Sequence, residues 1–197
     1  MESVLHERQH LQTVIETALL VASEPLSVHD LKKLFAEELK AELLNEVLEA
    51  IQQAWQGRGV ELVRLASGWR FRARLEYQPY LDRLSPEKPP RYSRAVMETL
   101  AIIAYKGPLT RGEIEEIRGV TVSTNIVKTL EERGWIEVVG YRETPGRPGL
   151  YSTTRAFLDD LGLKSRAELP PLAELGQLVL PDGAEQQGDG TLSIEAA

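Results

Sequence analysis

A seven-residue pattern that occurs twice constrains the fold of this chain more than any other feature. Its copies are Pro25-Leu26-Ser27-Val28-His29-Asp30-Leu31 and Pro108-Leu109-Thr110-Arg111-Gly112-Glu113-Ile114. In each copy a Ser or Thr precedes an acidic residue by three positions, which is the spacing of a helix start. The hydroxyl accepts from free N–H groups of the first turn, and the acid reaches back and complements the helix dipole. Two such copies in equivalent settings predict a duplicated unit.

The surroundings of the two copies also match. An amphipathic helix is predicted before each copy, over residues 11–22 and after a cap at Ser93. Apolar spacing over residues 44–55 and 126–130 predicts a further helix after each, the second ending at Gly134. Strands then follow at 59–63 and 134–139. Three helices and a β-hairpin are the order of a winged helix, so the sequence predicts a mostly α fold with small β-hairpins (α+β), built as two tandem winged-helix domains.

Changes in composition divide the chain into three parts. The proline-rich stretch 85–90 predicts an extended linker, because proline fixes φ and the residue before it avoids the helical region. We therefore expect an N-terminal domain over residues 1–85, a C-terminal domain over 86–165, and an acidic, largely disordered tail over 166–197. An apolar patch at 175–180 could dock on a neighbour or fold back on its own domain.

The first hairpin places three arginines near one another. A three-residue loop over 66–68, with Gly68 in the left-handed conformation, would pair Arg64 with Arg70 and Val63 with Phe71. Arg64, Arg70 and Arg72 would then share the outer face of the hairpin. A guanidinium presents a planar fork suited to phosphate or carboxylate. The three residues are a candidate patch for DNA or an acidic partner, or an ordinary solvated strand face.

The sequence offers no catalytic set. Without a single cysteine among its 197 residues, the chain has no thiolate nucleophile and no cysteine zinc site. His6 and His10 share a helix face but have no third ligand nearby, and residues 145–149 lack the Gly-Lys-[Ser/Thr] ending of a phosphate loop. We therefore predict a protein that is not an enzyme and that needs no cofactor and no metal.

The distribution of charge disfavours DNA reading. The net charge of −7 divides into −3 over residues 1–85, +1 over 86–165 and −5 over 166–197, whereas duplex-binding chains concentrate lysine and arginine. In the first predicted third helix, the outward-facing side chains are glutamates, which would repel phosphate. In the second, Asn125 and Lys128 could contact bases, but Glu131 and Glu132 beside them oppose that contact. Without a signal peptide or an apolar run of about 20 residues, we expect a soluble intracellular protein and no membrane partner.

Residues 92–157 resemble a known family. The runs 99–105 (TLAIIAY), 108–120 (PLTRGEIEEIRGV) and 145–154 (PGRPGLYSTT), with Phe157-Leu158 and the stretch 169–172 (LPPL), closely resemble the segregation and condensation protein B family. A looser match over residues 11–85 extends the resemblance to about residue 175. Tyr141 departs from the family pattern, in which a basic residue is more frequent after the glycine.

The resemblance implies a non-catalytic accessory subunit of the bacterial SMC–kleisin condensin complex. Such members are homodimers of tandem winged-helix proteins that bind the kleisin subunit ScpA and, through it, the SMC ATPase. They support chromosome condensation and segregation, and we expect a cytoplasmic, nucleoid-associated protein that binds DNA weakly or indirectly. The resemblance places dimerisation in the N-terminal domain and kleisin binding in the C-terminal domain. The alternative is a winged-helix transcriptional regulator, with the three wing arginines on phosphates.

Residue roles follow from the matching motif. Arg111 and Arg118 have no obvious internal partner in the sequence, so we expect them to contact the kleisin, together with Glu116. Arg147, between two prolines, is a further candidate. Ile102 and Tyr105 either complete an apolar groove for a kleisin helix or belong to the core.

Overall fold

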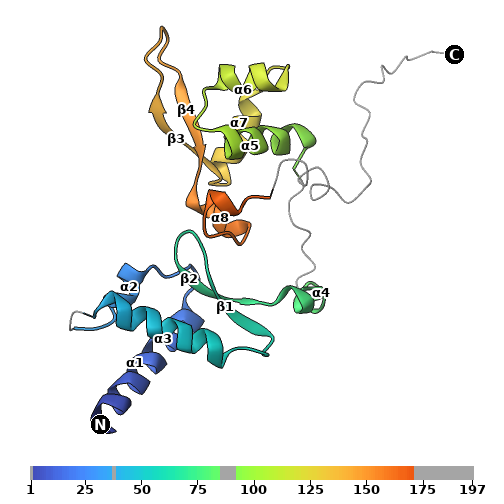
Figure 1. Cartoon of the computed structure of the whole chain (residues 1–197). Coiled ribbons are helices and arrows are strands. Elements are labelled where there is room, and N and C mark those ends of the chain that lie inside the picture. Colours follow the sequence, from blue (N-terminus) through green and yellow to red (C-terminus); the bar gives the residue numbers. More distant parts are fainter. Residues whose placement is uncertain (1, 37–38, 85–91, 171–197) are drawn as a thin grey trace, which may run out of the picture.

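The protein has a mixed fold of helices and small antiparallel hairpins, arranged as two groups of elements (Figure 1). A computed structural model describes residues 2–36, 39–84 and 92–170. Each group contains three helices followed by a two-stranded hairpin, which is the predicted order. The predicted linker at 85–90 and most of the predicted tail, residues 171–197, lie outside the described residues.

The N-terminal half ends in two short helical turns, and the C-terminal half continues past its hairpin in the same way. The N-terminal elements are α1 (Glu2–Val21), α2 (Val28–Lys32), α3 (Ala41–Ala54), β1 (Val60–Arg64), β2 (Trp69–Ala73), η1 (Leu75–Tyr77) and α4 (Gln78–Leu81). The C-terminal elements are α5 (Arg94–Lys106), α6 (Arg111–Arg118), α7 (Thr124–Glu132), β3 (Ile136–Tyr141), β4 (Gly149–Thr153), α8 (Arg155–Asp160) and η2 (Arg166–Glu168).

Each half has its own apolar core. The first is formed by α1, α2, α3 and β1, and its buried members are Leu11, Ile15, Leu19, Leu31, Leu44, Val47, Leu48, Ile51 and Leu62. The second gathers residues of α5, α6, the α6–α7 connection, α7, β3 and α8: Val96, Leu100, Ile103, Ala104, Ile114, Val122, Val127, Leu130, Ile136, Phe157 and Leu158. The buried residues of α3, at positions 44, 47, 48 and 51, follow the predicted i, i+3, i+4, i+7 spacing. In α1 only Leu11, Ile15 and Leu19 are buried, and Val14 and Ala18 are half-buried. Each fully buried Leu or Ile contributes about 1.5–3 kcal/mol.

The predicted helix starts are confirmed. The Ser27 hydroxyl accepts from the Asp30 N–H at 3.2 Å, and Ser93 caps α5 in the same way. Thr110 forms a complete capping box, because the Glu113 N–H donates to its hydroxyl while the Glu113 carboxylate accepts from the Thr110 N–H at 2.7 Å. Gly134 has a φ of 72°, as expected of a glycine just after a helix end.

The leucine of each repeated motif is bonded to the hairpin of its own half. Leu26 exchanges two backbone hydrogen bonds of 2.8 Å with Trp69, and Leu109 exchanges bonds of 3.0 and 2.8 Å with Tyr151. The bridge therefore joins the start of the second helix to the returning strand in both halves, an equivalence that supports the duplication.

The predicted register of the first hairpin is wrong by one residue. Arg64 pairs with Trp69, Val63 with Arg70 and Leu62 with Phe71. Arg64 thus lies on the face opposite Arg70 and Arg72, since neighbouring strand residues alternate between faces. Gly68 is not left-handed either. It is required by close approach, because a Cβ there would lie 2.3 Å from the Leu26 carbonyl oxygen.

The tip of this hairpin also contacts the C-terminal half. The Ala66 N–H donates to the Leu163 carbonyl at 3.1 Å, and the Ser67 N–H donates to Asp159 Oδ1 at 3.1 Å. Figure 1 shows the β1–β2 loop beside α8. The hairpin itself is closed by the Leu65 N–H, which donates to the Gly68 carbonyl at 2.7 Å. The chain therefore turns at residues 66 and 67 instead of over 66–68, and the pairing shifts by one residue.

Two further observations bear on the boundaries. Residues 166–170, assigned to the tail from sequence, pack on the C-terminal half, where Leu169 contacts the second core. Over the described residues, no helix is both long and apolar enough to span a membrane.

Substituting Gly68 should destabilise the N-terminal half. Gly68→Ala forces a methyl group into the Leu26 backbone, and we expect a loss of about 1–3 kcal/mol in the free energy of unfolding by urea. Gly112→Ala is the matched control, because nothing lies within 4 Å of its Cβ position and alanine favours a helix by about 0.5–1 kcal/mol. Equal stability of Gly68→Ala and the wild type would contradict the close-approach explanation.

Candidate partner-binding surfaces

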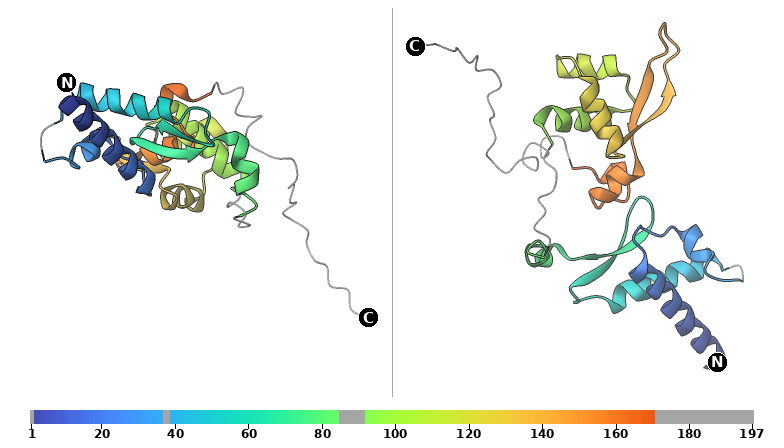
Figure 2. Two further views of the ribbon diagram at one scale, coloured as in Figure 1. Left: turned by 90° about the horizontal axis from the view of Figure 1, so that it is seen from below. Right: turned by 180° about the vertical axis from the view of Figure 1, so that it is seen from behind.

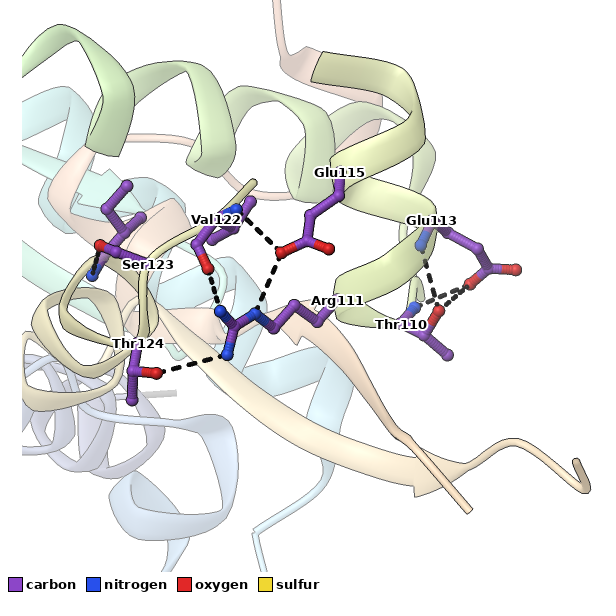
Figure 3. A network of polar contacts seen from close by, with 8 residues as sticks. Thr110, Arg111, Glu113, Glu115, Val122, Ser123 and Thr124 are labelled. Atoms are coloured by element: carbon purple, nitrogen blue, oxygen red, sulfur yellow. Dashed lines mark hydrogen bonds and ion pairs between the residues drawn. The ribbon is translucent and has the colours of Figure 1, made fainter. Parts of the chain in front are cut away.

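A polar network fixes the connection between α6 and α7 (Figure 3). The Arg111 guanidinium donates to the Val122 carbonyl, to Glu115 Oε1 at 3.2 Å and to the Thr124 hydroxyl at 3.3 Å. Glu115 Oε1 also accepts from the Val122 N–H at 2.9 Å. Val122 itself is fully buried in the second core. Arg111 and Glu115 together therefore satisfy both backbone groups of a buried residue.

The start of α6 is tied to the second hairpin by charge. Arg142, just after β3, forms an ion pair with Glu113, whose carboxylate also closes the capping box. Hydrogen bonds from the Thr110 N–H and hydroxyl, together with the Arg142 charge, hold the pKa of the Glu113 carboxyl below its ordinary value. The helix and the hairpin are thereby fixed side by side.

The Arg118 side chain is buried instead of exposed to solvent. Its side chain is 7% exposed and donates to Glu98 of α5 at 3.3 Å, while its Nε is buried without a hydrogen-bond partner among the described residues. Hydrogen bonds and charge from Arg94 and then Arg118 lower the pKa of the Glu98 carboxyl. The premise that Arg111 and Arg118 have no internal partner is therefore wrong, and both organise the surface around α6.

Ile102 and Tyr105 are half-buried against the second core. The Tyr105 hydroxyl donates to the Pro170 carbonyl, and Arg166 donates to the Ala104 carbonyl at 2.6 Å. The chain's own residues 166–170 therefore cover this end of α5. The sequence left open whether Ile102 and Tyr105 line an apolar groove for a kleisin helix or belong to the core.

The outer side of α6 and the turn after it expose apolar side chains. Ile117 is 42% exposed and Val120 is 57% exposed, and both lie near the exposed Glu116. We call Glu116, Ile117 and Val120 the α6 surface. Sequence reasoning singled out Glu116 but missed the other two, because Ile117 stands three residues after the buried Ile114 and shares its helical spacing.

The second hairpin exposes further groups. Val138, Val139 and Tyr141 of β3 are all exposed, and a bulge between Val138 and Gly140 interrupts the strict alternation of the strand. Arg147 is exposed in the loop that follows, with a φ of 39°.

The arginines of the candidate phosphate or acidic-partner patch lie on two faces, and one of them, like Lys128 of the third helix in the second half, is paired with a carboxylate. Arg72 donates to Glu61 Oε1 at 3.0 Å, Arg70 is exposed on the same face of the hairpin, and Arg64 is on the other. On α7, Lys128 lies 3.5 Å from Glu132. Within residues 2–36, 39–84 and 92–170, no group of three His, Cys, Asp or Glu residues could hold a metal ion.

Comparison with known proteins identifies the family. The model of "Segregation and condensation complex subunit ScpB" matches residues 13–172. The chain belongs to the ScpB family. A segregation and condensation protein B homolog of Coxiella burnetii is 48% identical over 167 residues, which cover 84% of this chain and 80% of that protein.

Two solved ScpB structures are also similar to this chain. The crystal structure of ScpB from Mycobacterium tuberculosis is 33% identical, covers 79% of this chain and 97% of its own, and has a TM-score of 0.37. A dimer of a ScpB N-terminal domain complexed with a ScpA peptide is 24% identical, covers 46% of this chain and all of its own, and has a TM-score of 0.34. The family model over residues 13–172 and the relative of Coxiella burnetii confirm the resemblance found from sequence at the level of the family.

The Glu115 network of this ScpB chain predicts a pH-dependent stability. The Val122 N–H and the Arg111 guanidinium lower the pKa of the Glu115 carboxyl from its ordinary value of 4.5. A carboxyl with a depressed folded pKa stabilises the native state above its unfolded pKa, and that contribution is lost as pH falls through the folded pKa.

Glu115→Gln should therefore lower the urea midpoint at pH 7, and the difference from the wild type should shrink by pH 3. Glu116→Gln is the matched control, since it removes the same charge one residue further along α6 without a bond to Val122. A difference between Glu115→Gln and the wild type that is the same at both pH values would contradict the ionic role of Glu115.

Proposed function

We propose that this chain is a non-catalytic accessory subunit of the bacterial SMC–kleisin condensin complex. In this role it binds the kleisin ScpA as a homodimer and supports chromosome condensation and segregation in the cytoplasm, at the nucleoid. The ATP chemistry belongs to the SMC partner. The observation that carries the proposal is the family match over residues 13–172, which includes the whole second core and all of the first core except Leu11.

The two halves are best described as tandem winged-helix domains. Each has three helices, a hairpin and a backbone bridge from the repeated leucine to that hairpin. We assign the N-terminal domain to residues 1–85 with the dimer contact, and the C-terminal domain to 86–165 with its extension to residue 170. The equivalent Leu26 and Leu109 bridges support this description of both halves.

We place the kleisin contact on the α6 surface, with Arg147 of the second hairpin as a further contact. Ile117 and Val120 offer apolar area beside a carboxylate, and the Arg111 and Glu113 networks hold α6 in place before any partner arrives. A surface that is already ordered loses little conformational entropy on binding. An amphipathic helix of the kleisin, apolar on one side and basic on the flank facing Glu116, matches this chemistry.

Direct DNA binding is a minor property in this proposal. The wing arginines lie on two faces, and Arg72 is paired with Glu61. Such a distribution releases few counterions from a duplex, so any affinity for DNA should be weak.

Acidic substitutions on the α6 surface should abolish capture of the kleisin. The double variant Ile117→Asp/Val120→Asp is co-expressed with the ScpA of the same genome, and the mass of the complex is measured by size-exclusion chromatography with light scattering. The wild-type chain should elute with the kleisin, and the double variant should elute alone with an unchanged circular dichroism spectrum. Leu161→Asp is the matched control, since Leu161 is an exposed apolar residue elsewhere in the same half.

Two results would contradict the proposal at different levels. Retention of the kleisin by the Ile117→Asp/Val120→Asp variant would reject the α6 surface alone. A wild-type chain that ignores the kleisin but retards duplex DNA at moderate salt would reject the subunit role itself and favour a DNA-binding regulator.

A further inference from the structure

The tip of the first hairpin joins the two halves of the chain. The Ala66 N–H donates to the Leu163 carbonyl at 3.1 Å, and the Ser67 N–H donates to Asp159 Oδ1 at 3.1 Å. We call these four residues the tip contact. Figure 1 and the right view of Figure 2 both show the β1–β2 loop against α8.

Two further groups support the tip contact. Ala66 packs against the second core, so a residue of the N-terminal hairpin extends the apolar cluster of the C-terminal half. The Arg72 guanidinium lies beside Gly162, where a Cβ would come within 2.7 Å of Arg72 Nη1. Gly162 follows the end of α8 with a φ of 73°, and a cation at a helix C-terminus complements the carbonyls there. The docked arrangement of the two halves is therefore specific.

The tip contact is nevertheless small for an interface between two folded units. Ala66 contributes a single methyl group, and none of the ion pairs within the described residues crosses between the halves. Relative motion of two units is the ordinary expectation unless their interface is large and apolar. Each half also has its own core, so both cores remain when the tip contact breaks.

The tip contact contains one group that opposes docking. The Ser67 hydroxyl oxygen is buried without a hydrogen-bond partner among the described residues. A buried polar group without a partner has lost the hydrogen bonds that it makes to water, and separation of the halves restores them. Docking is thus favoured by two hydrogen bonds and disfavoured by one hydroxyl.

Typical magnitudes leave the docked state only modestly favoured. A neutral hydrogen bond shifts an equilibrium by about 2- to 13-fold, and one to a charged acceptor by about 13- to 160-fold. An unpartnered buried hydroxyl acts in the opposite direction by about 5- to 160-fold. The orientational freedom that one half loses on docking opposes it further. A second, separated state is therefore populated beside the docked one.

We propose that the tip contact is a conformational switch, which holds the two halves docked in the major state and releases them in a minor state. The Asp159 carboxylate is the acceptor on which docking depends most, because a charged acceptor makes the stronger of the two hydrogen bonds. A ligand that prefers either state shifts the populations between them. The switch concerns the two halves of one chain and stands independently of the kleisin and of the dimer.

Distances between the halves test the switch directly. The chain has no cysteine, so Gln53→Cys on α3 and Asn125→Cys on α7 introduce two exposed positions that take spin labels. Pulsed electron paramagnetic resonance of the full chain should give a narrow major distance and a broad minor component. The labelled chain is unfolded and refolded with an excess of unlabelled chain, so that a dimer rarely contains two labelled protomers.

Two substitutions in the tip contact should move the populations in opposite directions. Asp159→Ala removes the acceptor of the Ser67 N–H and should raise the ratio of the broad to the narrow component about tenfold or more. Ser67→Ala removes the unpartnered hydroxyl but keeps the backbone donor, so it should lower that ratio by about fivefold or more. Glu143→Ala is the matched control, since it removes an exposed carboxylate of the same half from the loop between β3 and β4, and it should leave the ratio unchanged.

Amide hydrogen exchange of the full chain, resolved by NMR, provides a second measurement. The Ala66 and Ser67 amides should exchange faster in Asp159→Ala than in the wild type. The Leu109 and Tyr151 amides, which are bonded to each other's residue within the C-terminal half, should keep their wild-type rates. Faster exchange of all four amides would overturn the inference, because it would show unfolding of the C-terminal half instead of separation.

Three results of the distance measurement would also overturn the inference. They are a broad distribution alone in the wild type, wild-type populations in Asp159→Ala, and shifts of the same direction in Asp159→Ala and Ser67→Ala. The last result would show that the two substitutions act on the general stability of the fold, because only a contact between the halves gives them opposite signs.

Discussion

A pair of backbone hydrogen bonds, made once in each half, is the contact on which the rest of the structure depends. The leucine between the proline and the helix cap binds the returning strand of its own hairpin, Leu26 with Trp69 and Leu109 with Tyr151. Each bond contributes about 0.5–1.5 kcal/mol net, and an unpaired buried peptide group would cost more. The bridge demands a close approach of two backbones, which in the first half only a glycine at position 68 permits.

The same contact helps to hold the α6 surface in place. In the C-terminal half the bridge at Leu109 stands directly before the capping box of α6, and the Arg111–Glu115 network holds the far side of the same helix to buried Val122. With both sides satisfied internally, α6 presents Glu116, Ile117 and Val120 outward. Hydrogen bonds and ion pairs thus hold α6 in position, and exposed apolar side chains remain available for a partner.

The sequence predicted those features that depend on interactions between residues close together along the chain. Caps at Ser27, Ser93 and Thr110 and the helical spacing of both cores were confirmed, because a helix start and an amphipathic face are determined by neighbours along the chain. The predicted register of the first hairpin was wrong by one residue. Leu65 bonds to Gly68, and the two turn residues, 66 and 67, donate to Leu163 and Asp159, nearly a hundred positions away. The exposure of Ile117 and the burial of Arg118 likewise depend on tertiary packing that spacing does not encode.

The most direct test of the account is hydrogen exchange of the full chain, measured by mass spectrometry with and without its genomic ScpA. If the chain is a kleisin-binding subunit with a preordered α6, amides over residues 111–122 should exchange slowly even in the free protein. Peptides covering residues 116–121 should become further protected in the complex. Fast exchange of α6 in the free chain, or protection confined to the N-terminal half, would contradict the account.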